Sequence, residues 1–164
     1  MKSPRRRARE FVLQGLYQWQ LSGASVAQIG RDLAELEGYA AADAAFVETE
    51  LAGTIAESDA LRGLLEPLGD RKWTEMSPVE KAILLIAAWE LSHRPDMPYR
   101  VSINEAIELA KRFGGTDGHK YVNGVLDRLA VAVRAEEVAA GRTGERKPRT
   151  ASRARAPATK KAEA

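Results

Sequence analysis

The sequence predicts an all-α fold of about seven helices, for three reasons. Apolar residues recur at helical spacing along most of residues 4–135, and no stretch alternates convincingly enough for a strand. Serine or aspartate, which cap helix N-termini, stands ahead of most of these segments. Glycine or proline, which end helices, separates the segments from one another.

Cap residues place the first two helices. Ser3 and Pro4 supply an N-cap and a first-turn proline, so the first helix should run from Pro4 to the break at Gly23. Ser25, with Gln28 three residues later, fits a capping box that opens the second helix.

Three more helices are expected in the middle of the chain. The third should run from near Asp43 to about Ser58, and Ser58 should then cap a short helix over residues 60–68. Ser77 and Glu80 fit a capping box, with a proline between them, and open the fifth helix. Because the fifth helix is apolar nearly all round, we expect it at the buried centre of the second half.

The last two helices follow from a similar pattern. Ser102 and Glu105 fit another capping box, so the sixth helix should begin at Ser102 and end at Gly114. Asp117 should cap the seventh helix, which runs to about Ala135.

Charge is distributed unevenly along the chain. Residues 1–10 carry five basic residues and one acid, whereas residues 11–70 carry ten acids and two basic residues. From Ala139 on the chain has no large apolar residue, and residues 136–164 are expected to form a disordered basic tail. A basic arm beside an acidic half suggests two different partners, or one protein partner that is itself basic.

The composition argues against several classes of protein. There is no cysteine, and with only His93 and His119 we expect no metal site and no cofactor. The longest apolar run, residues 82–89, is far shorter than the ~20 residues that span a bilayer. Glutamines interrupt the apolar core that a signal peptide would need, so we expect a soluble cytoplasmic protein.

No catalytic arrangement emerges from the sequence. It has no phosphate-loop glycine pattern and no HExxH motif, and the serines with an evident role are helix caps. Glu90, within an apolar stretch, is expected in a half-buried ion pair. We therefore expect no enzymatic activity and assign no catalytic residue.

A cluster of arginines opens the first helix, namely Arg5, Arg6, Arg7 and Arg9. Guanidinium groups suit phosphate because they are planar and donate in pairs. At a helix N-terminus each cation opposes the helix dipole, at a cost of roughly 0.3–1 kcal/mol. Selection for helix stability would more readily place acids there, so the cluster favours nucleic-acid binding over its alternative, a solvated and solubilising helix end.

A helical wheel divides the first helix into two faces. One face should meet the core, and it comprises Ala8, Phe11, Val12, Gly15 and Trp19. The opposite face should be exposed, and it comprises Arg6, Arg9, Leu13 and Tyr17. Tyr17 is then either a partly packed tyrosine or an aromatic anchor for a protein partner or a base.

The start of the last helix is a second candidate site. His119, Lys120 and Tyr121 lie in its first turn, where free backbone N–H groups favour an anion. They suit a contact to single-stranded RNA, and the alternative is a capped helix with Tyr121 buried. Gly124, inside this helix, would be explained by a close crossing with the fifth helix.

Two stretches resemble the NusB family of bacterial transcription antitermination factors. They are RRRAREFVLQGLYQWQLS at residues 5–22 and MSPVEKAILLIAAWELSHRPDMPYRVSINEAIELAKRFGGTDGHKYVNGVLDRLA at residues 76–130. The same domain type occurs fused ahead of ribosomal-RNA cytosine methyltransferases. The sequence leaves no room for such a domain, so we expect the stand-alone factor, with an RNA-binding or protein-interaction module in ribosomal-RNA modification as the alternative.

The resemblance implies two small bundles, of three and then four helices, over about residues 4–58 and 59–135. It implies binding of boxA RNA together with NusE, a small-subunit ribosomal protein, in a complex with other Nus factors on RNA polymerase that supports ribosomal-RNA synthesis. Whether the free protein is a homodimer stays open. Ribosomal proteins are basic, so the acidic segment 11–70 would suit NusE.

The resemblance also assigns site residues. RNA would contact Arg5, Arg6, Arg7 and Arg9 and, on weaker grounds, His119, Lys120 and Tyr121. NusE would contact Tyr17 and Glu80, and a partner contact of Glu80 does not exclude its role in the capping box.

Overall fold

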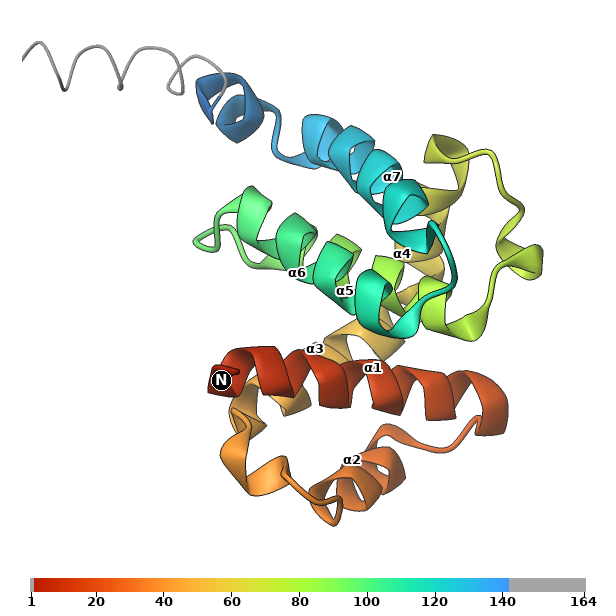
Figure 1. The fold of residues 1–164 in the computed structure, drawn as a ribbon, viewed down its shortest axis with the longest axis vertical. Coiled ribbons are helices and arrows are strands. Elements are labelled where there is room, and N and C mark those ends of the chain that lie inside the picture. Colours follow the sequence, from red (N-terminus) through yellow and green to blue (C-terminus); the bar gives the residue numbers. More distant parts are fainter. Residues whose placement is uncertain (1, 142–164) are drawn as a thin grey trace, which may run out of the picture.

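The computed structural model describes residues 2–141, so most of the predicted tail, residues 142–164, lies outside the described part (Figure 1). Residues 2–141 contain seven longer α-helices, a further short helical segment over residues 135–141 and three short 3-10 turns, with no strand. The all-α prediction is confirmed. No described helix is long and apolar enough to cross a membrane.

The first half of the chain forms three α-helices. Side-chain oxygens of Ser3, Ser25 and Asp43 each accept a hydrogen bond of 3.1 Å from the backbone N–H three residues later. The caps at Ser3 and Ser25 were predicted, and Asp43 lies where the third helix was expected to begin. The capping box at Ser25 is only half formed, because the side-chain oxygen of Gln28 accepts from Arg31 at 2.8 Å instead of from the Ser25 N–H. The elements are α1 (Pro4–Ser22), α2 (Val26–Ala34), the turn η1 (Tyr39–Ala41) and α3 (Ala44–Ala56).

The second half forms four α-helices. Ser77 caps α5 as predicted, since its Oγ accepts from the Glu80 N–H at 3.1 Å. Ser58 is the first residue of α4 rather than its cap, and the α-helix ends before residue 68 in a 3-10 turn. The elements are α4 (Ser58–Leu65), the turns η2 (Glu66–Leu68) and η3 (Trp73–Glu75), α5 (Pro78–His93), α6 (Tyr99–Phe113) and α7 (Gly118–Val133).

The predicted capping box at Ser102 and Glu105 is wrong. The sixth helix begins at Tyr99, directly after Pro98, whose φ of −57° already suits a helix start. The first N–H of α6 is satisfied by the Glu137 carboxylate at 2.9 Å. Ser102 therefore lies inside the helix, and its hydroxyl and the Glu105 carboxylate are free to make contacts elsewhere.

The prediction of disorder is also wrong for residues 136–141. They belong to a further helical segment, residues 135–141, that follows α7 after a break at Arg134. Val138 is buried, and the buried Arg134 guanidinium donates to the main-chain oxygens of Leu91 and Met97. One apolar side chain and these hydrogen bonds therefore fix the segment against α5 and α6.

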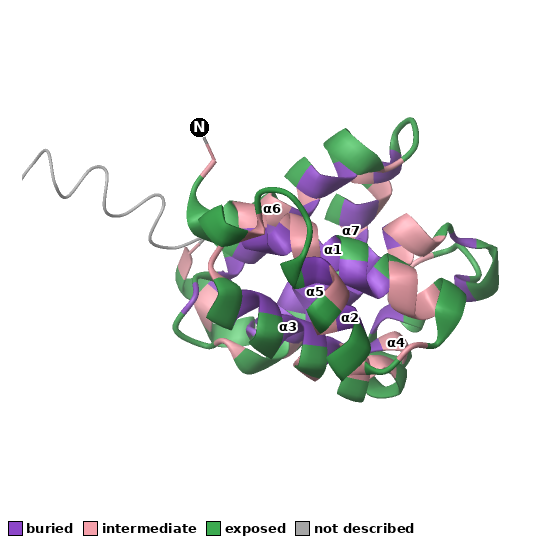
Figure 2. Cartoon of the chain, turned by 90° about the horizontal axis from the view of Figure 1, so that it is seen from below, coloured by how far each residue is buried: buried purple, intermediate pink, exposed green. Residues whose placement is uncertain are grey.

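α5 forms the buried centre of the second half, as predicted: every residue from Ala82 to Leu91 is buried (Figure 2). α5, α6 and α7 pack against one another, and α1 packs against α3 as well as α5. The buried residues of both halves therefore form one hydrophobic core.

Close helix approaches occur at other glycines than predicted. A Cβ on Gly53 would lie 2.5 Å from the Trp89 ring, so α3 can approach α5 only with glycine there. A Cβ on Gly124 would meet only the Arg128 side chain, at 3.6 Å or more, so the close crossing predicted at Gly124 is wrong.

Candidate nucleic-acid interface

The arginines at the start of α1 divide into exposed and buried groups. Arg5 and Arg6 are exposed and Arg7 is half-buried, whereas Arg9 is 3 % exposed. The wheel placed Arg9 and Leu13 on an exposed face, and that prediction is wrong for both residues. Arg9 contacts Glu90 of α5 and Glu105 of α6 and lies 5.1 Å from the Phe46 ring of α3, which a wheel of α1 alone could not show.

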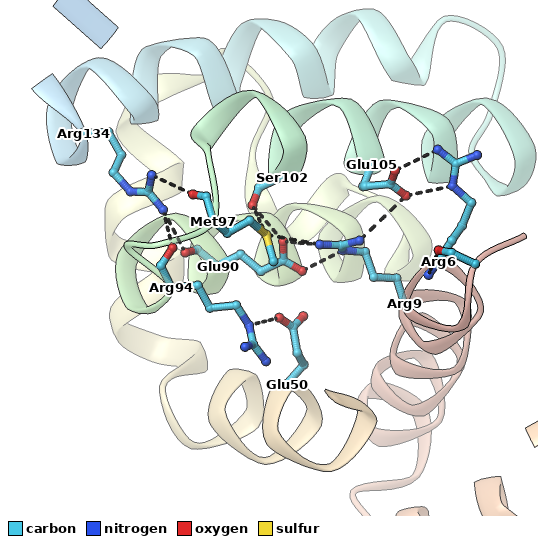
Figure 3. Close-up of polar contacts among 10 residues, drawn as sticks. Arg6, Arg9, Glu50, Glu90, Arg94, Met97, Ser102, Glu105 and Arg134 are labelled. Carbon is cyan, nitrogen blue, oxygen red and sulfur yellow. Dashed lines mark hydrogen bonds and ion pairs between the residues drawn. The ribbon is translucent and has the colours of Figure 1, made fainter. Parts of the chain in front are cut away.

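Arg9 forms a buried ion pair with Glu90. Its guanidinium donates two hydrogen bonds, of 2.9 and 3.0 Å, to the two carboxylate oxygens of Glu90, which is fully buried (Figure 3). Burial opposes the charge of Arg9, but the hydrogen bonds and the charge of Glu90 outweigh it and raise the Arg9 pKa. Arg9 therefore joins α1 to α5 inside the protein and does not face solvent.

Glu105 connects this buried pair to the surface. It accepts two hydrogen bonds from Arg6, of 3.1 and 2.8 Å, and lies 3.8 Å from the guanidinium of Arg9. The hydrogen bonds and charge of Glu105 raise the Arg6 pKa. Ser102, one turn earlier on α6, donates to Glu90 at 2.8 Å. The two residues predicted as a capping box are thus parts of one network between α1, α5 and α6 (Figure 3).

A second buried carboxyl group, that of Glu50 on α3, lies close to Glu90. Glu50 is fully buried and accepts a hydrogen bond of 2.7 Å from Nε of Arg94, the residue that ends α5. Burial, together with the charge of Glu90, raises the pKa of Glu50 to about 9. Glu50 therefore keeps its proton more readily than an exposed carboxyl group and offsets less of the positive charge of Arg94 than an ionised carboxylate would.

The start of α7 is more tightly packed than its polar sequence indicates. Tyr121 is half-buried, its hydroxyl accepts from the Arg71 N–H at 3.3 Å, and the Arg71 guanidinium lies 4.1 Å from its ring. Lys120 is exposed and pairs with Asp117 at 3.5 Å. Asp117 is the N-cap residue, but its side chain makes no capping bond, and its φ of +64° is unusual for a residue other than glycine. His119 is half-buried in the same turn.

Glu80 belongs to this packed corner. It is 8 % exposed, and its carboxylate lies 3.5 Å from Arg71. A Cβ on Gly118 would lie 2.5 Å from the Glu80 Oε2, so the carboxylate sits against the first residue of α7, where the helix dipole favours a negative charge. Glu80 thus holds the corner together.

Tyr17 is 41 % exposed, as predicted, and lines an open groove of about 580 Å³ between α1 and the end of α6. Phe113, 42 % exposed, lines the same groove, and sequence analysis did not single it out as a site residue. The feature of the sequence that could have identified Phe113 is its position at the end of a helix, directly before a glycine. The other lining residues are Glu10, Phe11, Leu13, Gln14, Glu37, Val79 and Arg112.

The structure does not bring the two predicted RNA-contacting groups together. Gln20 donates to the main-chain oxygen of Pro78 at 2.9 Å, so the start of α5, on which the α7 corner rests, lies beside the end of α1. The arginines lie at the other end of α1, a helix of 19 residues that is roughly 28 Å long. The Tyr17 groove lies between them. No group of three metal-ligating side chains is present among residues 2–141.

Comparisons with known proteins agree with this fold. The model of the NusB family matches residues 6–131. A "Transcription antitermination protein NusB" of Thiobacillus denitrificans is 54 % identical over 138 residues, which cover 84 % of this chain and 95 % of that protein.

Two solved structures are also similar. T. maritima NusB matches with a TM-score of 0.72 and 31 % identity, over 84 % of this chain and 99 % of that one. A crystal structure of antitermination factors NusB and NusE with double-stranded RNA matches with a TM-score of 0.68, over 77 % of this chain and 96 % of that one; at 18 % identity it shows the fold alone.

Proposed function

The chain belongs to the NusB family, and we propose that it is a non-catalytic RNA-binding antitermination factor that binds boxA RNA together with NusE and supports ribosomal-RNA transcription. Its relatives carry the name of transcription antitermination proteins. The main structural support is the first turn of α1, where basic side chains reach solvent from an ordered helix.

Arg5, Arg6 and Arg7 are the RNA-contacting residues that we propose on α1. Arg5 and Arg7 form no ion pair with any of residues 2–141, so no carboxylate in that part of the chain competes with a phosphate group for them. Arg6 pairs with Glu105, but its side chain is 46 % exposed and can exchange that carboxylate for a phosphate. We leave Arg9 out, because reaching RNA would break the buried pair with Glu90.

The α7 corner would give a weaker RNA contact. Lys120 is exposed, and its only ion pair in the described part of the chain is a solvated one with Asp117. His119 and Tyr121 are half-buried, and Tyr121 is already held by Arg71. We therefore propose that Lys120 makes the contact and that Tyr121 positions the turn.

The Tyr17 groove would bind NusE. It offers exposed aromatic rings, which act as anchors in protein interfaces, and it is flanked by Glu10 and Glu37. Glu10 is already paired with Lys2 and Arg112, so Glu37 is the acid of this groove that would suit a basic ribosomal protein. Glu80 is too buried to supply much contact area, so we propose that it contributes by holding Arg71 and the α7 corner in place.

We further propose that the heterodimer acts in the cytoplasm with other Nus factors on RNA polymerase. A homodimer of the free protein would use the same exposed groove, because Tyr17 and Phe113 are exposed aromatic residues on one surface. NusE would then compete with self-association.

A salt titration of RNA binding tests the proposed function. Affinity for a boxA RNA and for a scrambled RNA is measured on the full chain, with and without NusE. We expect tighter binding of boxA and a further gain when NusE is added. Replacing Arg6 and Arg7 by alanine should lower the salt slope by ~0.7 for each phosphate group that the variant no longer neutralises. Equal affinity for both RNAs, or a slope unchanged in the double variant, would contradict the proposal.

A further inference from the structure

We propose that Arg94, together with Arg5, forms a second phosphate-binding site for RNA, where the first turn of α1 meets the end of α5. The inference rests on the proposed RNA-binding function, and it adds a residue that is 89 positions away from Arg5 in the sequence. It extends the RNA path from the arginines of α1 towards α3 and the loop after α5.

Both guanidinium groups lie around one aromatic ring. The Cζ atoms of Arg5 and Arg94 are 4.7 and 4.4 Å from the centroid of Phe46, so they lie no further apart than the sum of these two distances. The same two arginines line two neighbouring hollows, of about 280 Å³ beside the residue 96–98 loop and about 170 Å³ beside the start of α3. Two cations thus border a space that is open to solvent.

The Arg94 guanidinium is held in place by one hydrogen bond, and its other N–H donors remain available. Within residues 2–141, the Arg94 side chain donates one hydrogen bond, from Nε to Glu50 at 2.7 Å. The Nη1 and Nη2 groups have no hydrogen-bond acceptor in that part of the chain. A planar guanidinium fixed at one edge keeps its remaining donors in a geometry that suits phosphate.

The positive charge of Arg94 is only weakly screened by water and only weakly offset by its hydrogen-bond partner. Its side chain is 21 % exposed, so water screens it less than it screens a fully exposed arginine. The hydrogen-bond partner of Arg94 is Glu50, and Glu50 is neutral at pH 7 because its pKa is raised to about 9. A protonated carboxyl group therefore positions Arg94 without cancelling its charge, which leaves that charge available for an anion.

Two acids, Asp43 and Asp96, border the hollows, and they differ in their expected effect on a phosphate group. The Asp43 carboxylate is occupied, because it accepts from the Phe46 N–H at 3.1 Å and so caps α3. Asp96 is exposed on the rim of the larger hollow and would repel a phosphate. Removing the charge of Asp96 should strengthen phosphate binding without disturbing the core.

The first part of the test measures RNA affinity against salt for Arg94→Gln, with Arg31→Gln as a control that removes one exposed arginine on α2. We expect Arg94→Gln to reduce the salt slope by ~0.7 and Arg31→Gln to leave it unchanged. Glu50→Gln should leave the slope unchanged, since it replaces a neutral group by a neutral one. Asp96→Asn should raise RNA affinity, and this variant does not depend on the buried hydrogen bonds of Arg94.

The second part titrates inorganic phosphate into the wild-type protein at constant ionic strength and follows the arginine Nε–H signals by NMR. Saturable shifts of Arg5 and Arg94, together with a reduced salt slope in Arg94→Gln, support an RNA phosphate site. Phosphate-induced shifts with an unchanged salt slope would mean that the site takes free phosphate only, and this overturns the extension of the RNA path.

If Arg94→Gln and Asp96→Asn both leave RNA affinity and slope unchanged while Arg6→Ala/Arg7→Ala reduces them, the Arg5–Arg94 site is wrong and the proposed function stands. If the wild-type protein shows no salt-dependent RNA binding, both are wrong.

Discussion

Arg6 and Arg9 lie three positions apart on one helix, yet they belong to different regions of the molecule. Arg6 reaches solvent at the first turn of α1, whereas Arg9 is buried in an ion pair with Glu90 of α5. The residue type is the same in both places, and only the neighbouring helices differ. An arginine cluster in a sequence is therefore not one site, because tertiary packing assigns some of its members to the surface and others to the core.

The largest expected effect is on stability, and it comes from the buried region. Replacing Arg9 by glutamine leaves Glu90 buried with an uncompensated charge, which should cost about 3–5 kcal/mol of unfolding free energy. Chemical denaturation followed by circular dichroism measures this decrease. Arg112→Gln is the matched control, since it removes an exposed pair with Glu10 that should be worth at most ~1 kcal/mol. If Arg9→Gln and Arg112→Gln lowered the unfolding free energy equally, the buried Arg9–Glu90 pair would matter no more for stability than an exposed ion pair, which would contradict the prediction.

The second prediction concerns the exposed surface further along α1. Tyr17→Asp should weaken NusE binding by more than tenfold, because an exposed aromatic anchor is replaced by an acid. Isothermal titration calorimetry measures this effect, with Gln14→Asp as a control for the charge in the same groove. Unfolding free energy should change little. A large drop in stability in Tyr17→Asp would place Tyr17 in the core, against the structure.

The third prediction uses the pH dependence of the buried region. The folded-state pKa of Glu50 is raised from 4.5 to about 9, so between these values the folded chain holds a proton that the unfolded chain releases. Stability should therefore fall as pH rises through this window, by up to about 1.4 kcal/mol per pH unit. Glu50→Gln should remove this slope when urea denaturation is repeated from pH 5 to pH 9. A wild-type stability that rises with pH across the window, with the same rise in Glu50→Gln, would contradict the assignment.

The smallest predicted effect concerns the residue that joins the two regions. Glu105→Gln releases Arg6 from its carboxylate and should raise RNA affinity a few-fold, with a modest decrease in stability from the weaker interaction with Arg9. Glu108→Gln is the control, because Glu108 is also on α6 and lies near Arg6 but accepts no hydrogen bond from it. RNA affinity that rises equally in both variants would indicate a general charge effect instead.

Local signals in the sequence predicted much of the fold. Caps at Ser3, Ser25, Asp43 and Ser77 depend on residues three positions apart, and all four form. The Ser102–Glu105 pattern failed because a motif of this kind cannot reveal that both side chains meet partners on α5 and α1.

The candidate site was predictable only in part, for a similar reason. Exposure of Tyr17 and of the first arginines follows from the pattern of α1 alone. Burial of Arg9 depends on Glu90, 81 residues away, and the contact of Arg94 with Glu50 spans 44 residues. Pairings over such distances leave no mark in the local periodicity of one sequence.

The most direct test compares salt-dependent RNA binding of Arg7→Gln and Arg9→Gln, measured where both variants are folded by circular dichroism. Each variant removes one arginine from the same helix, so the net charge changes equally. We predict that Arg7→Gln lowers the salt slope by ~0.7 and that Arg9→Gln leaves it unchanged while reducing stability. The reverse pattern, with a slope lowered by Arg9→Gln and not by Arg7→Gln, would contradict the division of this helix into an RNA-binding end and a buried structural pair.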